Sequence, residues 1–224
     1  MKKTLCAALL FLLLEIAAAC LSVLHAGTDA RLYLQCFNAY AQTERLGVRP
    51  GSYPDLAESL AGYLGGERES PQTLTPRTGA GTAAPAFNDR ELTHLSDIRR
   101  IFSILARAWT LYLPAAGLAL LLWKGRAAPA SVWTGFLLSL LPWAGAAAWA
   151  ALDFTGAFIA LHRLAFTNEL WLLNPNTDLL ICLMPQEMFV FLARRLALTL
   201  APAFLLPPTA AVLLHIIRKQ RTHT

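Results

Sequence analysis

Two histidines, His94 and His162, have the residue type and the sequence setting for acid–base chemistry. Glu91 and Asp97 lie three residues on either side of His94, so on a helix both carboxylates lie about one turn from its ring. Histidine titrates near neutral pH and can accept or donate a proton during a reaction. Taken singly, each histidine is more often a structural residue. Both fall in segments that we predict on the same side of a membrane, which favours a shared function.

Other catalytic arrangements do not occur in the sequence. There is no Gly-x-Ser-x-Gly elbow, phosphate-binding glycine loop or His-Glu-x-x-His motif. Ser96 lies two residues from His94 and would face another way on a helix, which disfavours a covalent serine mechanism. His94, Asp97, His162 and Asp178 are residue types that zinc accepts, but their spacing forms no zinc motif. We therefore expect no metal and no cofactor.

The composition indicates that membrane-spanning helices position these residues. Of the 224 residues, 56% are hydrophobic and 15% are charged, and the mean hydropathy is +0.46. A soluble domain is roughly a quarter charged. Irregular backbone cannot face lipid, so apolar runs of about 20 residues are interpreted as helices. The sequence predicts one all-α, polytopic membrane domain over residues 1–224, with four transmembrane helices at about 5–24, 101–123, 132–152 and 189–217.

Positive charge sets the predicted orientation, because short cytoplasmic loops accumulate Lys and Arg. The two termini and the turn between the second and third spans carry no acidic residue and these basic ones: Lys2, Lys3, Lys124, Arg126, Arg218, Lys219 and Arg221. We therefore expect both termini in the cytoplasm and extracytoplasmic segments at 25–100 and 153–187, with the site at the outer leaflet. The net charge of +5 is explained by this asymmetry, so no nucleic-acid partner is implied.

The first apolar run has an alternative interpretation as a cleaved signal peptide. Two lysines precede it, and Ala17–Cys20 faintly resembles a lipoprotein cleavage site. Glu15 interrupts the apolar run, and the residue three before the cysteine is alanine rather than a larger aliphatic one, so we favour a retained helix. No Cys-x-x-Cys occurs, and the cysteines suit small buried positions. A bridge between Cys36 and Cys182 stays open.

The first outward segment contains two predicted helices and a loop. Apolar residues at helical spacing predict helices over 29–46 and 54–64. The stretch 65–86 is rich in Gly, Pro, Thr and Ser and has no period, so we expect a mobile loop there.

Order is predicted to resume at Asn88. Asn88 and Glu91 have the spacing of a capping box, and the helix that they begin should continue into the second span. The amphipathic stretch 153–166 suits an interfacial helix. Residues 174–178 indicate a turn, and Pro185 is well placed to start the last span.

Two arginines near the outer end of the last span, Arg194 and Arg195, could reach lipid phosphates. Substrate binding and ordinary headgroup contact are equally compatible with them. Tryptophans at span ends usually anchor helices in the interface, which is our interpretation of most of the six.

Two stretches of the chain resemble the signature segments of the bacterial lipoprotein intramolecular transacylases, a family of four-span membrane proteins. They are Phe87-Asn-Asp-Arg-Glu-Leu-Thr-His94-Leu-Ser-Asp97-Ile and Leu161-His162-Arg-Leu-Ala-Phe166-Thr-Asn168-Glu-Leu-Trp171-Leu-Leu-Asn174-Pro175-Asn-Thr-Asp178-Leu-Leu-Ile181-Cys-Leu-Met-Pro185. The second is the more specific, because its His, Phe, Asn, Trp and Pro-x-Thr-Asp follow in order at matching spacing. Leu161 and Ala165 stand where the family often has Phe, which bears on the shape of the pocket.

The resemblance implies a membrane acyltransferase that acts on diacylated lipoproteins among membrane phospholipids. The sn-2 acyl chain of the S-diacylglyceryl cysteine would move to the α-amine of the same cysteine, leaving an N-acyl, S-monoacylglyceryl product. The resemblance assigns the acid and base to His94 and His162, without saying which does which. Residues that would orient these groups or stabilise the oxyanion are Glu91, Asp97, Asn168, Trp171 and Asp178.

This reaction needs no nucleophile from the protein. An α-amine has a pKa near 8, so a base of neutral pKa can free it, and the rest of the task is proximity and stabilisation of the oxyanion. Two alternatives stay open: a non-enzymatic membrane scaffold, and a metal-dependent membrane hydrolase that uses the same His and Asp residues. Imidazoles more than roughly 10 Å apart would favour the scaffold, because a reacting group must lie within reach of both acid and base.

Overall fold

The structure is a computed structural model that describes residues 2–76, 83–123 and 128–221, without the side chains of 111, 113–123, 218 and 221. Its described helices and strands are α1 (Lys2–Gly27), α2 (Ala30–Tyr40), η1 (Glu44–Leu46), η2 (Pro50–Ser52), α3 (Tyr53–Gly65), β1 (Leu74–Pro76), β2 (Ala83–Pro85), α4 (Asp89–Trp123), α5 (Pro129–Leu152), α6 (Phe154–Ala165), α7 (Leu179–Leu183) and α8 (Gln186–Arg221).

The chain divides into two compact units, and each is described by itself. The first unit comprises Met1–Ser22, Ala106–Ala157 and Arg195–Thr224, and the second comprises Val23–Leu105 and Phe158–Arg194. The single domain that we predict over 1–224 stays a prediction.

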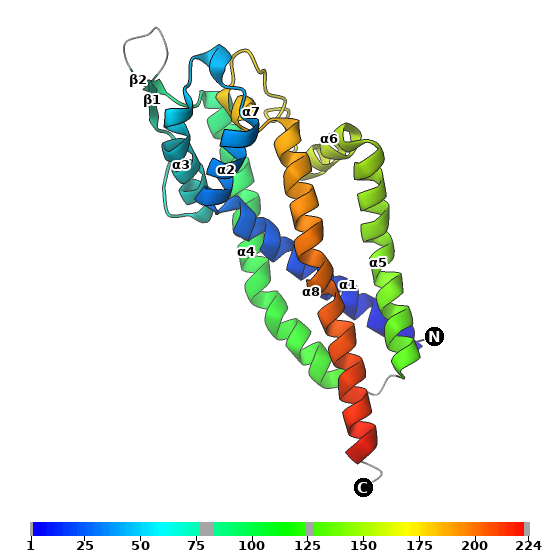
Figure 1. Ribbon diagram of the computed structural model, residues 1–224. Coiled ribbons are helices and arrows are strands. Elements are labelled where there is room, and N and C mark those ends of the chain that lie inside the picture. The colour runs from blue at the N-terminus through cyan, green and yellow to red at the C-terminus, as the bar shows by residue number, and fades with distance from the viewer. Residues whose placement is uncertain (1, 77–82, 124–127, 222–224) are drawn as a thin grey trace. The chain divides into compact units, whose positions relative to one another are not determined.

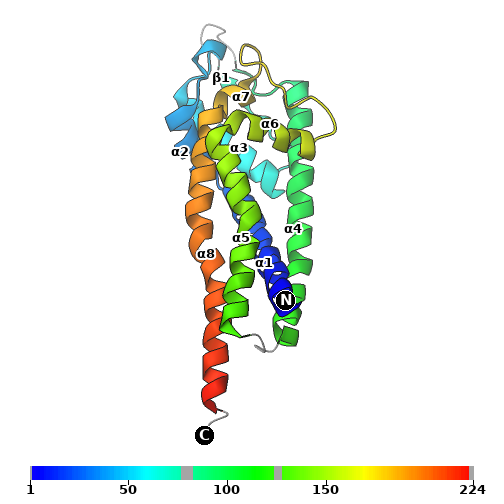
Figure 2. The same cartoon turned by 90° about the vertical axis from the view of Figure 1, so that its right-hand side faces the viewer.

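Three described helices are long and apolar enough to cross a membrane: Lys2–Gly27, Pro129–Leu152 and Gln186–Ile217. They match three of the four predicted spans, and most of their side chains are not covered by protein, as lipid-facing helices require. The other predicted span, 101–123, falls in α4, which is one continuous helix (Figure 2). Most of the side chains of this span lie outside the described residues, so the count of four stays a prediction.

In the first unit, α1 and α5 approach each other closely at a small-residue contact. A Cβ atom added to Gly135 would lie 2.6 Å from the Cβ of Ala7, too close for any side chain. One turn further along α1, Phe11 meets Phe136 edge to face, with ring centroids 6.0 Å apart. Small residues that let helices approach are typical of membrane-spanning pairs, where packing rather than the hydrophobic effect holds helices together.

The same pair of helices shares a polar contact at Glu15. This side chain is only 3% exposed. Ser139 Oγ donates to one carboxyl oxygen at 2.8 Å, and Trp143 Nε1 donates to the other at 3.0 Å. Glu15, which interrupts the first apolar run, therefore bonds to α5 through both of its oxygens, as polar groups inside a bilayer require.

The contacts also give the direction of the two helices. Ala7, Phe11 and Glu15 advance along α1 while their partners advance along α5 from Gly135 to Trp143. Two helices whose contacts advance together run parallel.

In the second unit, α2 and α3 pack side by side (Figure 1). Asp29 caps α2 by accepting from the main-chain N–H groups of Arg31 and Leu32. The helix predicted over 29–46 is too long, because α2 ends at Tyr40 and a separate 3₁₀ turn, η1, follows. Thr43 explains the break: its hydroxyl is buried and bonds to the Val48 carbonyl and the Tyr53 hydroxyl, so the chain turns there.

The core of the second unit joins α2 and α3 to the start of α4, to α7 and to the start of α8. Its fully buried side chains include Phe37, Leu56, Leu60, Leu95 and Leu183. The predicted helix over 54–64 is confirmed as α3, which ends at Gly65 and is capped by Gly66 with a φ of +84°, a conformation that favours glycine.

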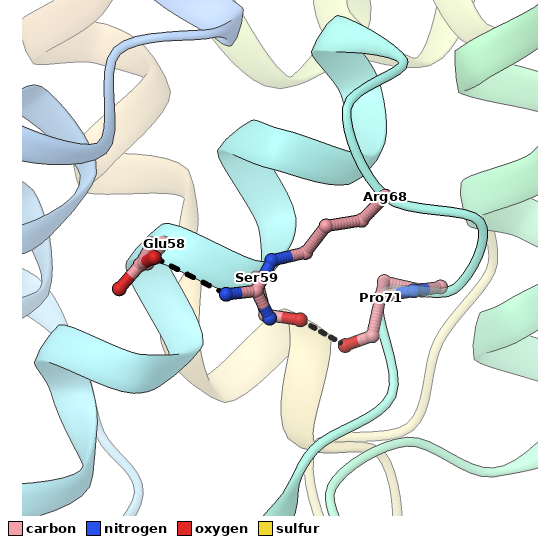
Figure 3. Close-up of polar contacts among 4 residues, drawn as sticks. All are labelled: Glu58, Ser59, Arg68 and Pro71. Carbon is pink, nitrogen blue, oxygen red and sulfur yellow. Dashed lines mark hydrogen bonds and ion pairs between the residues drawn. The ribbon is translucent and has the colours of Figure 1, made fainter.

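The loop predicted over 65–86 is in part wrong, because its described residues contain an antiparallel strand pair. Leu74 lies opposite Pro85, and Pro76 opposite Ala83; residues 77–82 lie outside the described part. Hydrogen bonds from side chains to the main chain hold the segment that leads into this strand pair. Such bonds cannot be predicted from the periodicity of apolar residues. Ser59 donates to the Pro71 carbonyl at 2.8 Å, beside an ion pair of Arg68 with Glu58 (Figure 3).

The base of the strand pair is closed by one side-chain amide. Gln72 donates through Nε2 to the Phe87 carbonyl at 2.7 Å and accepts from the Phe87 N–H at 2.9 Å. These two hydrogen bonds fix the main chain of Phe87, the residue directly before the predicted cap of α4.

The four cysteines are unbridged. Cys36 and Cys182 are buried, as small apolar residues often are, and neither forms a disulfide.

Candidate active site

The helix that carries His94 begins at a capping box, as the sequence predicts. The Asn88 side chain accepts from the Glu91 N–H at 3.1 Å, and the Glu91 carboxylate accepts from the Asn88 N–H at 2.8 Å. The other oxygen of Glu91 accepts from the Leu180 N–H at 2.6 Å, in the first turn of α7. Glu91 thus joins the starts of α4 and α7, whereas the sequence predicts that it orients His94.

Asp178 anchors the turn before α7. It accepts from the Asn174 N–H at 2.7 Å, from the Thr177 hydroxyl at 2.9 Å and from the Asn88 side-chain amide at 2.8 Å. Although burial opposes the charged form, these bonds together with Arg90 lower the pKa of Asp178. The predicted turn over 174–178 is confirmed, and its carboxylate connects it to the cap of α4.

The structure brings the two candidate histidines together. The ring centroids of His94, on α4, and His162, on α6, lie 6.4 Å apart. Phe166 contacts both rings, at 5.0 Å from His94 and 5.6 Å from His162. This separation is well inside the limit of roughly 10 Å that we set above for a shared acid–base site.

The His162 ring is held by its own helix. Its Nδ1 lies 2.8 Å from the carbonyl oxygen of Phe158, one turn earlier in α6. A carbonyl oxygen only accepts hydrogen bonds, so Nδ1 carries the hydrogen and the neutral ring presents a lone pair at Nε2. The rings of Phe158 and Trp171 enclose the imidazole at centroid distances of 4.1 and 5.0 Å.

His94 is the more deeply buried of the pair, with 5% of its surface exposed. Among the described residues, its Nδ1 has no hydrogen-bond partner. Burial, followed by the nearby His162, lowers the pKa of His94 to about 4, against an opposing effect of Asp97. Burial also lowers the pKa of His162. Both rings are therefore neutral at pH 7.

Asp97 is connected to the loop that follows α6. Asn168 donates its side-chain amide to Asp97 at 2.9 Å and accepts from the Leu170 N–H at 3.0 Å. Asn168 thus fixes the Asp97 carboxylate, which lies one turn from His94 and favours the charged form of that ring.

Three residues around the pair have roles that sequence reasoning missed. Phe158 lay in the predicted amphipathic stretch and Phe166 in the second signature segment, neither with an assigned role, yet both touch a histidine ring. Arg90 donates to the main-chain carbonyls of Glu169 and Leu172, at 2.8 and 3.1 Å, and so ties α4 to the loop after α6. An arginine that bonds main-chain carbonyls leaves no local sequence signal, because its partners lie about eighty residues away.

The predicted headgroup residues, Arg194 and Arg195, are exposed on α8. Within the described residues neither side chain has a hydrogen bond or ion pair. Across the same described residues, no group of three or more His, Cys, Asp and Glu side chains is arranged to hold a metal ion.

An open cavity of about 270 Å³ lies beside the histidine pair. It shares the side chains of Phe166, Asn168 and Trp171 with the surroundings of the pair. Its other lining residues come from α6 and the following loop: Ile159, Arg163, Thr167, Glu169 and Leu172.

Helices long and apolar enough to cross a membrane, together with two neighbouring neutral histidines of which His94 is buried, define a polytopic membrane protein with a candidate acid–base site. A family model described as lipoprotein intramolecular transacylase Lit matches residues 8–189. The chain therefore belongs to the lipoprotein intramolecular transacylase family.

Solved structures agree with this fold. The membrane-integral lipoprotein intramolecular transacylase Lit from Bacillus cereus is similar with a TM-score of 0.72 and 17% identity, covering 99% of this chain and 97% of that one. A variant of the same Bacillus cereus protein with a histidine-to-alanine mutation gives a TM-score of 0.68 at 16% identity, covering 99% and 94% of the two chains. A comparison with curated protein sequences finds no match.

Proposed function

We propose that this transacylase moves the sn-2 acyl chain of an S-diacylglyceryl cysteine to the α-amine of the same cysteine. The amine attacks the ester carbonyl, the bond between acyl carbon and glycerol oxygen breaks, and the proton lost by the amine is balanced by one delivered to the glycerol oxygen. The observation that carries this proposal is the neutral histidine pair, with ring centroids 6.4 Å apart. Acid and base are then present at one place, and the substrate supplies the nucleophile.

His162 is the base in this proposal. Its Nδ1 hydrogen is engaged by the Phe158 carbonyl, so the free lone pair is at Nε2. The lowered pKa of His162 keeps that lone pair available at neutral pH. A base with its tautomer already fixed needs no rearrangement before it accepts the amine proton.

In this proposal His94 contacts the substrate through its ring nitrogen Nδ1. Its buried Nδ1 has no partner among the described residues, and a buried polar atom without a partner is costly until a ligand satisfies it. The substrate would supply that partner. Asp97, held by Asn168, favours the imidazolium that forms transiently if a proton passes through His94.

Donors for the oxyanion stand next to the pair. Trp171 contacts the His162 ring and carries an indole N–H, while Asn168 uses one of its two amide hydrogens on Asp97. The indole N–H and the second amide hydrogen are the donors that we assign to the tetrahedral intermediate.

The parallel packing of α1 and α5 supports four spans. If two parallel helices both cross a bilayer, the chain between them must cross back, and α4 contains the long helix in that interval. Four spans place both termini on one side. We therefore propose a protein of the bacterial cytoplasmic membrane with cytoplasmic termini and the site at the outer leaflet, and with Arg194 and Arg195 near lipid phosphates.

Mass spectrometry of a lipoprotein N-terminal peptide tests the reaction. The protein is expressed in a bacterium that lacks lipoprotein N-acyltransferase activity, and fragmentation locates the acyl chains. Conversion to the N-acyl, S-monoacylglyceryl form at unchanged total mass is expected. His94→Ala and His162→Ala should each lower the rate by about a hundredfold or more, as loss of acid–base catalysis does.

The matched control is His215→Ala, near the end of α8 and not among the site residues, which should convert lipoproteins at the unmodified rate. Product at the unmodified rate in both site variants would refute the mechanism. A scaffold is disfavoured by the closeness of the two rings. Metal-dependent hydrolysis would appear as activity lost with a chelator and restored by added metal.

A further inference from the structure

We propose that the cavity beside the histidine pair binds the first residues of the lipoprotein's polypeptide, directly after the lipidated cysteine, through their main chain. This inference rests on the proposed function and adds a binding site for the protein part of the substrate. It is carried by the position of the cavity, its size and the two charged side chains in its lining.

Position comes first. Phe166 and Trp171 line the cavity and also contact the His162 ring. In the substrate, the reactive amine and the carbonyl that begins the peptide are bonded to the same carbon atom. When the amine lies at His162, the peptide must therefore start within about 4 Å of it. The cavity is the adjoining space that could receive the peptide.

The size of the cavity argues against the whole lipid. Pockets that take complete drug-sized ligands are roughly 300–1,000 Å³, and this cavity is about 270 Å³ and open. It suits a short piece of extended chain that continues outward, which a folded protein attached to the cysteine requires.

The two charged side chains in the lining favour a peptide main chain over other occupants of the cavity. Arg163 and Glu169 line the cavity, and within the described residues neither side chain has a hydrogen bond or ion pair. A guanidinium can donate to peptide carbonyls, while a carboxylate can accept from peptide N–H groups. An acyl chain would desolvate both charges without compensation. A phosphate would face the carboxylate of Glu169.

Bonds from Arg163 and Glu169 to the peptide main chain do not depend on the side chains of the ligand. Bonds to main-chain groups give affinity that does not depend on sequence, which suits an enzyme whose substrates share only a lipidated cysteine. Trp171 and Leu172 add apolar contact at the cavity wall.

Binding of two ether-linked analogues to the full-length, detergent-solubilised protein tests the proposal. Both contain dialkylglyceryl cysteine, whose ethers cannot be transferred. One ends as the cysteine amide, and the other continues into a short uncharged peptide. The peptide analogue should bind about tenfold more tightly, a difference of about 1.4 kcal/mol.

The double variant Arg163→Gln/Glu169→Gln should lose this gain and keep the affinity for the amide. Arg31→Gln, an exposed arginine outside the cavity, is the matched control and should keep the gain. Equal melting temperatures of all three proteins verify folding.

Three results would overturn the proposal: no gain in the unmodified protein, a gain that survives the double variant, or an equal loss for both analogues. The last would place the lipid part of the ligand in the cavity. Failure of the proposed reaction is separate, since lipoproteins would then be unconverted in cells while the gain from the peptide persisted.

Discussion

At the scale of single residues, the site combines two imidazoles whose charged forms are both disfavoured. Burial acts on each ring, and the closeness of the rings adds to it at His94. A base of low pKa is weaker than an ordinary histidine, but it is fully available at neutral pH. In the mechanism that we propose, the lone pair at Nε2 of His162 is thus available to the substrate amine at neutral pH.

The His94 pKa gives a direct test of this environment. Titration of isotopically labelled His94, followed by NMR, should show a neutral ring until the pH falls to about 4. In Asp97→Asn the pKa should be lower still, because the carboxylate that favours the cation is gone. Titration near the ordinary value of 6.5 would mean that the ring is exposed to water.

The sequence was enough to predict which residues carry the candidate chemistry, but not which distant segments pack around them. The spacing of Glu91, His94 and Asp97 predicts one face of a helix, and the capping box at Asn88 is present as predicted. That Glu91 bonds the start of α7 could not be predicted, because its partner lies 89 residues away and is a main-chain N–H. Local spacing carries no information about such distant contacts.

At the scale of elements, α1 and α5 are joined by one buried acid and one close contact at glycine. The sequence marks Glu15 as a polar residue in an apolar run and goes no further. Its donors, Ser139 and Trp143, are one turn apart on α5, a face that only the structure pairs with α1.

Replacement of Glu15 tests this contact. Glu15→Ala removes both bonds and should lower the free energy of unfolding in detergent by about 1–3 kcal/mol, since an interhelical bond in a membrane is worth about 0.6–1.7 kcal/mol. Glu15→Gln should lose less, because its amide can accept from Trp143 and donate to Ser139 Oγ. Equal loss in the two variants would show that these bonds do not hold the pair.

At the scale of the whole molecule, the charge asymmetry and the parallel α1–α5 pair independently support the four spans that we propose. The charge pattern was readable from sequence because it is a sum over short loops. The direction of the helix pair was not, since it depends on which residues meet.

Reporter fusions test that topology. Green fluorescent protein fused to the C-terminus should fluoresce, and alkaline phosphatase there should be inactive, because both report a cytoplasmic location. A phosphatase fusion after Asn176 should be active and serves as the control. An active phosphatase at the C-terminus, with the N-terminus cytoplasmic, would indicate three spans instead of four.

The bond between His162 and the Phe158 carbonyl has a consequence for how the base can be lost. The acceptor belongs to the peptide backbone, so no side-chain replacement at position 158 removes it while α6 stays helical. Reactivity at Nε2 is then a property of one twelve-residue helix being wound. Solvents or lipids that unwind α6 would break this bond without any change of sequence, and we expect activity to fall with the helicity of that segment.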